Sequence, residues 1–180
     1  MKLIIVRHSQ TIEANEWHEK VELRPLSKTG RIRAEVFGKV LEKKYRHSFQ
    51  YFYSSEYRRA IETAEILRKY LKPVHFLITD ALNPDRSPEE IVNLINKTPE
   101  TKKYILLVGH TPFIENLVSM LTGKKENIHF KKPSMCELEI SDGKAEIVSF
   151  FNYDDIPDDI KIPIKKATPY EEEIEELEIG

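Results

Sequence analysis

The chain has 180 residues, a length that fits one domain built around a single hydrophobic core. Its 28 basic and 30 acidic residues nearly balance, so the totals do not indicate a nucleic-acid surface, and any affinity for anions must come from local clusters of charge. The single cysteine excludes an internal disulfide framework and fits a reducing compartment, and no apolar run is long enough for a signal peptide or a membrane span. We therefore expect a cytoplasmic protein that binds neither nucleic acid nor a membrane.

Strands and helices alternate along most of the chain. Strands are predicted from short apolar runs, and helices from apolar residues that recur with helical spacing between capping and stop signals. In chain order, the predicted elements are a strand over 2–6, a helix over 31–45, a strand over 50–53, a helix that ends before Pro73, a strand over 74–78, a helix over 88–96, a strand over 104–108, a helix over 111–122, and strands over 135–140 and 145–150.

Several boundaries carry residues with capping chemistry. The run Ser27-Lys-Thr-Gly30 supplies N-cap chemistry for the helix over 31–45, and Ser54 or Ser55 is the predicted cap of the helix that follows the second strand. Residues 9–25 form a polar loop that is long for a compact α/β domain. Long loops commonly carry function, so we expect this loop to lie near a binding site.

The alternation of elements predicts an α/β fold, a single-domain three-layer α/β/α sandwich with a mostly parallel sheet and helices on both faces. Asp142-Gly143 lies between the last two strands and is a hairpin signal, so this C-terminal strand pair should be antiparallel. We expect one domain over residues 1–156. Residues 157–180 form an acidic C-terminal tail, because they are too acidic and too poor in apolar residues to predict a packed segment.

Histidine and arginine residues follow three of the predicted strands. Arg7 and His8 follow the first strand directly, Arg59 comes shortly after the second, and His110 follows the strand over 104–108. The carboxyl ends of strands form the ligand-binding edge of open α/β sheets, so we expect these side chains to lie together. Guanidinium groups stay charged and bind phosphate oxygens in pairs, and the combination therefore indicates a phosphate site.

The same residues resemble the signature segments of a known family. These segments are Arg7-His8-Ser9, Ser55-x-x-x-Arg59-Ala60-x-x-Thr63-Ala64 and Val108-Gly-His110-Thr-Pro112. Together, and in this order over residues 1–150, they resemble the histidine phosphatase superfamily, which has the phosphoglycerate-mutase-like fold. The run Arg24-Pro-Leu-Ser-Lys-Thr-Gly30 and the small size are similar to its SixA-like branch of phosphohistidine phosphatases.

The resemblance implies a phosphatase that uses no cofactor. It assigns His8 as the nucleophile that is phosphorylated in turnover, with Arg7, Arg59 and His110 completing the phosphate site. Such a nucleophile must attack as a neutral imidazole, and adjacent guanidinium groups would lower its pKa. A metal is not expected, because no further ligand spacing accompanies the two histidines and because arginines repel a cation.

The acid that protonates the leaving group is left open between two carboxylates. Asp85 lies after the third strand, in the region that supplies the acid in much of the superfamily, and Glu22 lies just before the SixA-like run. Three further residues are candidates for substrate binding. Arg24 either reaches the phosphate or braces the loop, Ser9 either strains a glycine position or offers a hydroxyl, and Asn15 lies one position beyond a family asparagine.

We expect a phosphohistidine or phosphoprotein phosphatase, because the insertions with which mutases clamp sugar phosphates are missing. A small-metabolite phosphatase or a mutase of the same superfamily is the alternative. The non-enzymatic alternative is a phosphate-binding pseudoenzyme or a partner-binding module. The partner is accordingly a phosphorylated protein or a small phosphomonoester, and the sequence predicts no oligomeric state.

Overall fold

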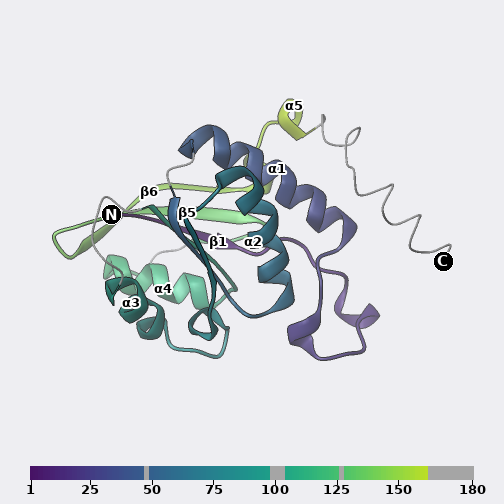
Figure 1. The fold of residues 1–180 in the computed structure, drawn as a ribbon, viewed down its shortest axis with the longest axis horizontal. Coiled ribbons are helices and arrows are strands. Elements are labelled where there is room, and N and C mark those ends of the chain that lie inside the picture. The colour runs from purple at the N-terminus through teal and green to yellow at the C-terminus, as the bar shows by residue number, and fades with distance from the viewer. Residues whose placement is uncertain (47–48, 98–103, 126–127, 162–180) are drawn as a thin grey trace.

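A six-stranded sheet forms the centre of the computed structural model, which describes residues 1–46, 49–97, 104–125 and 128–161 (Figure 1). The strands are β1 (Lys2–Arg7), β2 (Phe49–Ser54), β3 (His75–Ile78), β4 (Tyr104–Gly109), β5 (Ser134–Ser141) and β6 (Lys144–Asn152). The helices are α1 (Lys28–Tyr45), α2 (Arg58–Leu71), α3 (Pro88–Lys97), α4 (Phe113–Thr122) and α5 (Asp158–Lys161). Short 3₁₀ helices are η1 (Ala14–Glu16), η2 (Val21–Leu23), η3 (Asp80–Leu82) and η4 (Tyr153–Asp155).

The strands are ordered β3-β2-β4-β1-β5-β6 across the sheet. The first four in this order run parallel, whereas β5 pairs antiparallel with both β1 and β6. The predicted mostly parallel sheet with an antiparallel C-terminal pair is therefore confirmed. Because β5 runs against β1, the start of β5 lies beside the end of β1, where Ser134 pairs with Arg7.

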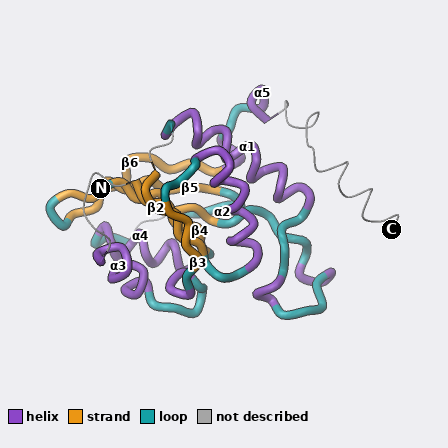
Figure 2. The backbone as a smooth tube through the Cα atoms, viewed as in Figure 1, coloured by secondary structure: helices purple, strands orange, loops and turns teal. Residues whose placement is uncertain are grey.

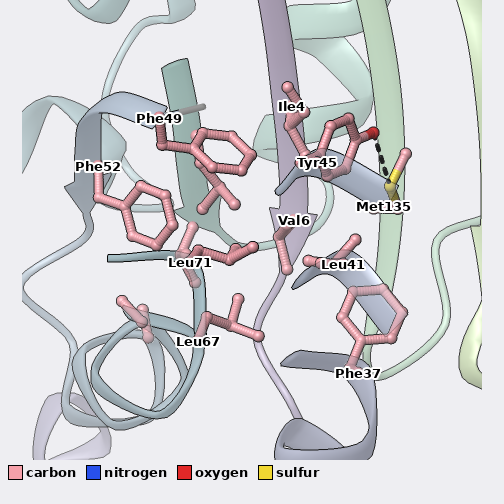
Figure 3. Packing of buried hydrophobic residues seen from close by; sticks show 14 of the residues in the cluster. Ile4, Val6, Phe37, Leu41, Tyr45, Phe49, Phe52, Leu67, Leu71 and Met135 are labelled. Atoms are coloured by element: carbon pink, nitrogen blue, oxygen red, sulfur yellow. Dashed lines mark hydrogen bonds between the residues drawn. The ribbon is translucent and has the colours of Figure 1, made fainter. Parts of the chain in front are cut away.

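Helices cover the sheet on both faces, α1 and α2 on one face and α3 and α4 on the other (Figures 1 and 2). Alternate residues of β1 serve the two layers: Ile4 and Val6 pack with α1 and α2, whereas Leu3 and Ile5 pack with α3 and α4. Figure 3 shows the first layer, in which Ile4 and Val6 lie among side chains of α1, α2 and β2. The predicted α/β/α sandwich is thus confirmed.

Two predicted helix starts differ in outcome. Ser27 caps α1 as predicted, since its side chain accepts a hydrogen bond from Gly30 N at 3.0 Å. The predicted capping of α2 by Ser54 or Ser55 is wrong, because this helix begins after Tyr57 and has no side-chain cap. The hydroxyl of Ser55 instead makes hydrogen bonds at the candidate active site described below.

The chain continues beyond β6 through η4 to the short helix α5. Residues 162–180, which make up most of the predicted acidic tail, lie outside the described residues. The division into a domain over 1–156 and a tail therefore stays a prediction. Within the ranges that the structure describes, no helix has the length and apolar character needed to cross a membrane.

A buried carboxylate on β5 ties the sheet to the end of α1. Glu137 is only 2% exposed. Its carboxylate contacts Lys2 Nζ at 3.2 Å, Lys44 Nζ at 2.9 Å and the Tyr45 hydroxyl at 2.9 Å. Burial alone would raise the pKa of Glu137, but these hydrogen bonds outweigh burial and hold the pKa below its usual value. The charged carboxylate therefore stabilises the fold.

We expect Glu137→Gln to lower the free energy of unfolding at neutral pH by about 2 kcal/mol, because hydrogen bonds to a charged acceptor are lost. The pKa of Glu137 is lower in the folded state than its usual 4.5, so its contribution is complete above pH 4.5 and is lost as the pH falls through the folded-state pKa. Urea unfolding at neutral and at acidic pH measures this difference, which should shrink at acidic pH. Glu139→Gln, at an exposed position of the same strand, is the control, and equal losses in both variants would contradict the expectation.

Candidate active site

The two predicted histidines lie side by side at the carboxyl edge of the sheet. β1 and β4 pair in register up to Arg7 and Gly109, so the next residues, His8 and His110, leave the sheet together. Their ring centroids are 5.0 Å apart, and both residues are buried, with 4% and 2% of their surfaces exposed. This spacing lets both rings reach one small tetrahedral group.

His8 is held in one tautomer by a backbone carbonyl. Its Nδ1 lies 2.7 Å from Ser9 O, and because a carbonyl oxygen only accepts hydrogen bonds, Nδ1 carries the proton. The lone pair is therefore on Nε2, as a nucleophile requires. Burial, and after it the charged form of His110 and two cationic side chains, lowers the pKa of His8 well below 6.5. The ring is consequently neutral at neutral pH.

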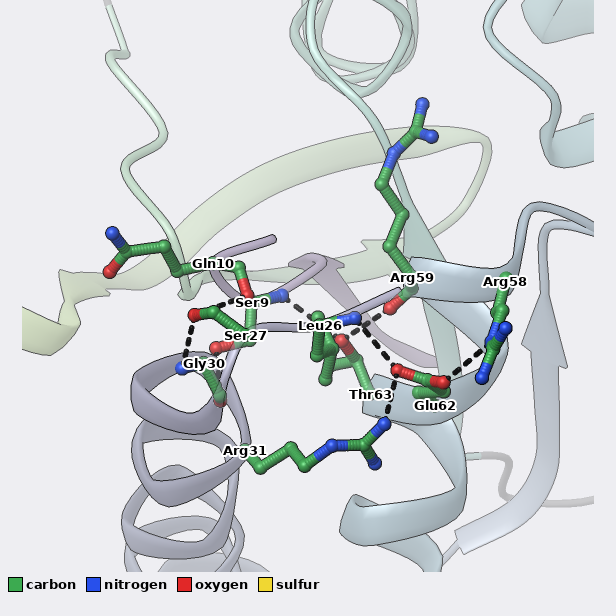
Figure 4. Close-up of polar contacts among 10 residues, drawn as sticks. All are labelled: Ser9, Gln10, Leu26, Ser27, Gly30, Arg31, Arg58, Arg59, Glu62 and Thr63. Carbon is green, nitrogen blue, oxygen red and sulfur yellow. Dashed lines mark hydrogen bonds and ion pairs between the residues drawn. The ribbon is translucent and has the colours of Figure 1, made fainter. Parts of the chain in front are cut away.

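The loop after His8 is braced against α1 and α2 (Figure 4). Ser9 N donates to Thr63 Oγ1 at 3.0 Å, and Ser9 Oγ donates to Gly30 O at 2.6 Å. Thr63 Oγ1 in turn donates to Arg59 O at 2.7 Å. The threonine of the second signature segment thus joins the loop after His8 to the helix that carries Arg59.

Ser9 is fully buried, and its hydroxyl donates to Gly30 O in the first turn of α1. Its φ is not in the left-handed region, since positive φ outside glycine occurs, among the described residues, at Arg46, Lys72 and Asp142. Serine in place of the family's glycine therefore causes no left-handed strain at this position. Substrate binding by Ser9 stays a prediction.

A close approach of two backbones requires Gly30. A Cβ atom at Gly30 would lie 1.8 Å from Gln10 O. The first turn of α1 therefore packs directly on the loop after His8, where Ser27 N also donates to Gln10 O at 3.0 Å. This contact places the Gly30 carbonyl where it receives the Ser9 hydroxyl.

Arg7 and Arg59 are anchored by backbone carbonyls. Arg7 Nη1 donates to Phe130 O, and Arg7 Nε is buried without a hydrogen-bond partner among the described residues. Arg59 is 7% exposed, its Nη1 donates to Val21 O at 2.8 Å, and its guanidinium lies 4.7 Å from the ring of Tyr57. The carbonyl oxygens fix the two guanidinium groups in place, and neither group forms an ion pair with a carboxylate of a described residue. The charges of Glu115 and Glu22 act on Arg7 and Arg59 only from a greater distance.

Arg58 and Arg59 point to different sides of α2 (Figure 4). Arg58 Nε donates to Glu62 Oε1 at 2.8 Å, and Glu62 Oε2 accepts from Leu26 N at 2.8 Å, which fixes the loop that carries Arg24.

Burial, and then the charge of Arg24, lowers the pKa of Arg59 to about 10. Arg24 is therefore close to Arg59, and its own buried Nε has no partner within the described residues.

His110 is held by polar groups on the side of its ring that carries Nε2. This atom lies 2.9 Å from Ser55 Oγ, which lies 2.7 Å from Asn83 Oδ1. The ring of Tyr57 packs edge-on against the imidazole, with centroids 5.1 Å apart. Burial, followed by the charges of Arg59 and two further cations, lowers the pKa of His110 to about 3. This ring is also neutral at neutral pH.

Sequence reasoning missed Lys132, Tyr57 and Asn83. The charge of Lys132 acts on both histidines, and burial together with three nearby arginines lowers the pKa of its half-buried ammonium group. The sequence feature that could have indicated Lys132 is the dipeptide Lys131-Lys132, just before the predicted strand over 135–140. Lys132 therefore adds a cation from the antiparallel side of the sheet.

Both candidate acids act electrostatically on Tyr57. Glu22 in η2 and Asp85 after η3 are both exposed. Burial first, and then the charges of these two carboxylates, raises the pKa of Tyr57. Neither carboxylate makes a hydrogen bond or ion pair within the described part of the chain, so both stay candidates. Asn15 in η1 is also exposed, and its side chain makes no hydrogen bond to any described residue.

The groups around the two histidines suit an anion. Their electrostatic neighbours include two arginines and a lysine. Among the described residues there is no group of three or more histidine, cysteine, aspartate or glutamate side chains that could hold a metal ion. A ligand with several negatively charged oxygens would complement this charge.

Three solved structures share the fold. The protein histidine phosphatase SixA in complex with tungstate is 18% identical, with a TM-score of 0.75, and the match covers 87% of this chain and 100% of that one. A protein from Agrobacterium tumefaciens that is provisionally assigned as the phosphohistidine phosphatase SixA is 19% identical, with a TM-score of 0.72 over 83% of this chain and 96% of that one. The mycobacterial glucosyl-3-phosphoglycerate phosphatase in complex with VO3 is 18% identical, with a TM-score of 0.67 over 84% and 98%. At these identities the likeness establishes the fold alone.

The sequence itself matches a family model over part of its length. Residues 3–83 match the model of the histidine phosphatase superfamily (branch 1), whereas a search of curated proteins found no match. This match confirms the resemblance that the motifs indicate. Together with the structural neighbours, the match supports a phosphoester hydrolase.

The low pKa of His110 has a measurable effect on stability. The unfolded chain takes up a proton at this residue below pH 6.5, whereas the folded chain does so only near pH 3, so stability is lost as the pH falls between these values. We expect His110→Asn to reduce the slope of unfolding free energy against pH, by about 0.7 kcal/mol per pH unit at pH 6.5 and by about 1.3 kcal/mol per pH unit at pH 5. His18→Asn, at an exposed position, should leave the slope unchanged. An unaltered slope in His110→Asn would show that His110 is charged in the folded protein.

Proposed function

We propose that this protein is a metal-independent phosphatase that transfers the phosphoryl group of its substrate to Nε2 of His8 and then releases it to water. The observation that carries the proposal is the hydrogen bond from His8 Nδ1 to Ser9 O. It leaves the Nε2 lone pair free in a buried, neutral imidazole that lies 5.0 Å from His110. A neutral imidazole with its lone pair fixed in direction is the activated form of a histidine nucleophile.

The cationic side chains supply the electrostatic part of the reaction. Charge in the transition state of phosphoryl transfer is spread over three equatorial oxygens, so catalysis consists mainly of positioning and charge stabilisation. Arg7 and Arg59 approach from β1 and α2, and Lys132 from the segment before β5. Because the arginines are anchored by carbonyl oxygens, their charge is available to the phosphoryl group.

A phosphohistidine or phosphoprotein is the substrate class that the site supports best. Glu22 and Asp85 are exposed and unanchored, so no acid is held ready to protonate a poor leaving group. The imidazole of a phosphohistidine leaves more readily than an alkoxide and depends less on such an acid. The connection from β3 to α3 spans only residues 79–87, which leaves little chain for a sugar-phosphate clamp.

Hydrolysis of a small phosphomonoester is the second candidate. The charges of Glu22 and Asp85 both act on Tyr57, whose ring contacts His110. Both carboxylates therefore act electrostatically on a ring that contacts His110, and either one is a candidate for the acid that protonates an alkoxide. The structural likeness to a glucosyl-3-phosphoglycerate phosphatase is consistent with this candidate.

The mechanism is tested by trapping the intermediate. We expect the wild-type protein to hydrolyse an aryl phosphate in excess EDTA. A substrate that carries radioactive phosphate should label the protein, and this label should be lost in acid and kept in base, as the phosphate of a phosphoramidate is. His8→Ala should lower kcat by at least about 1,000-fold, because the nucleophile is removed. His18→Ala should retain activity and labelling. Full activity of His8→Ala, or loss of wild-type activity in EDTA, would overturn the mechanism.

The substrate class is tested by varying the leaving group. We expect kcat/KM to be higher for a phosphorylated histidine-phosphotransfer domain than for a panel of alkyl phosphates, because imidazole needs less protonation on departure. Glu22→Gln or Asp85→Asn should slow alkyl phosphates while leaving the phosphohistidine substrate and aryl phosphates nearly unaffected. Faster turnover of one alkyl phosphate than of the phosphoprotein would favour the metabolite candidate instead.

A further inference from the structure

The hydrogen bonds of Asn83 fix the direction of its side-chain amide. Asn83 Nδ2 donates to Glu56 Oε2 at 3.1 Å, and a carboxylate only accepts, so the amide nitrogen must lie on this side. Asn83 Oδ1 accepts from Glu56 N at 3.1 Å, which agrees with this assignment. The oxygen of Asn83 therefore faces Ser55.

Ser55 has one hydroxyl proton, which it donates in a hydrogen bond to Asn83. Ser55 Oγ lies 2.7 Å from Asn83 Oδ1, which has no proton to give, so Ser55 is the donor in this contact. Two other groups contact Ser55 Oγ: Tyr57 N, which donates at 3.3 Å, and His110 Nε2 at 2.9 Å. Since the hydroxyl proton is already used, Nε2 must donate. His110 is thus the Nε2–H tautomer.

The other ring nitrogen of His110, Nδ1, carries no proton and keeps its lone pair. Nδ1 of His110 is buried and has no hydrogen-bond partner among the described residues. His8 has the reverse arrangement, with its proton on Nδ1 and its lone pair on Nε2. The two neighbouring rings are therefore held in opposite tautomers by different protein groups. In the ligand-free protein, Nδ1 of His110 can therefore accept a hydrogen bond but cannot donate one.

We propose that Ser55 and Asn83 are positioning residues that keep the Nδ1 lone pair of His110 available to the substrate, so that His110 becomes a donor only by taking a proton from the phosphoryl group it binds. The inference rests on the proposed function and extends it. A phosphoryl monoanion transfers the proton on its oxygen to His110 Nδ1, which yields the phosphoryl dianion and an imidazolium. The imidazolium then donates its Nδ1–H to the same oxygen.

The charges around His110 explain why this proton must arrive with the substrate. Arg7 acts on the ring from β1, Arg59 from α2 and Lys132 from the segment before β5, and each of these cations adds to burial in disfavouring a charged imidazole in the empty site. The neutral ring of His8 lies beside it. Tyr57 packs against its edge. A bound phosphoryl group adds negative charge among these cations, and only then does an imidazolium gain a partner.

Nitrogen NMR on the wild-type protein labelled with ¹⁵N-histidine tests the tautomers directly, because a protonated ring nitrogen and one with a lone pair resonate at well-separated frequencies. We expect His110 to carry its proton on Nε2 and His8 on Nδ1 at neutral pH. Titration with inorganic phosphate should move the His110 Nδ1 signal towards that of a protonated nitrogen. A proton on Nδ1 of ligand-free His110, or no change with saturating phosphate, would overturn the proposal.

Variants separate positioning from folding. In Asn83→Ala the Ser55 hydroxyl regains a free proton, so both His110 tautomers should appear, and kcat should fall roughly 10-fold to 100-fold with a shifted acid limb of the pH profile. Ser55→Ala should cause a similar loss, and the double variant should lose little more than either single one. Ser54→Ala removes a neighbouring buried hydroxyl that donates to Ser55 O and should leave the His110 tautomer unchanged.

These measurements distinguish failure of the positioning proposal from failure of the proposed function. Tautomers and phosphate-induced protonation are measured in the resting protein and need no turnover, whereas labelling of His8 needs no particular tautomer of His110. A single His110 tautomer in Asn83→Ala together with an unshifted pH profile would show that Asn83 plays no positioning part. Absence of labelling at His8 with the expected tautomers would instead refute the phosphatase mechanism alone.

Discussion

Positive charge that is anchored but not neutralised is the constraint on which the rest of the site depends. The cations around the two histidines are Arg7, Arg24, Arg59 and Lys132. Their mutual repulsion, added to burial, lowers the pKa values of Arg59 and Lys132, so the empty site is electrostatically unfavourable. Carboxylate partners would relieve the repulsion but would also compete with a phosphoryl group. Backbone carbonyls at Phe130 and Val21 fix the arginines and leave their charge for the substrate.

The surrounding fold holds this charge in place through backbone contacts. Parallel pairing of β1 with β4 delivers both histidines to one edge, and His8 N extends that ladder by donating to Gly109 O at 3.1 Å. The loop after His8 is held by two helices, through the carbonyl of Gly30 in α1 and the hydroxyl of Thr63 in α2. Glu62 fixes the loop that follows through Leu26 N. Stability in the sheet and in the first turns of α1 and α2 thus offsets the electrostatic cost of the site.

The part of the site that lies at the ends of parallel strands could be predicted from the sequence. Arg7, His8 and His110 directly follow apolar runs, and a parallel sheet must bring such exits to one edge. Lys132 could not be found this way, because it precedes a strand, and only the antiparallel direction of β5 brings that strand's start to the same edge. The sequence predicts Ser54 or Ser55 as a helix cap, because serine before a helix usually caps it. Its partners come from other segments, and no local pattern reveals them.

The carbonyl of Ser9 has a second consequence in the proposed cycle. When Nε2 of His8 attacks phosphorus, Nδ1 keeps its proton, because Ser9 O continues to accept it. The product of the first step is therefore an N-phosphorylated imidazolium rather than a neutral phosphoimidazole. In the second step this ring departs from phosphorus as a neutral imidazole, which is a far better leaving group than an imidazole anion. The hydrogen bond that directs the lone pair towards the substrate thus also keeps the intermediate reactive towards water. A nucleophile held this way needs no acid of its own in dephosphorylation, and any requirement for Glu22 or Asp85 is confined to the departure of the substrate's leaving group.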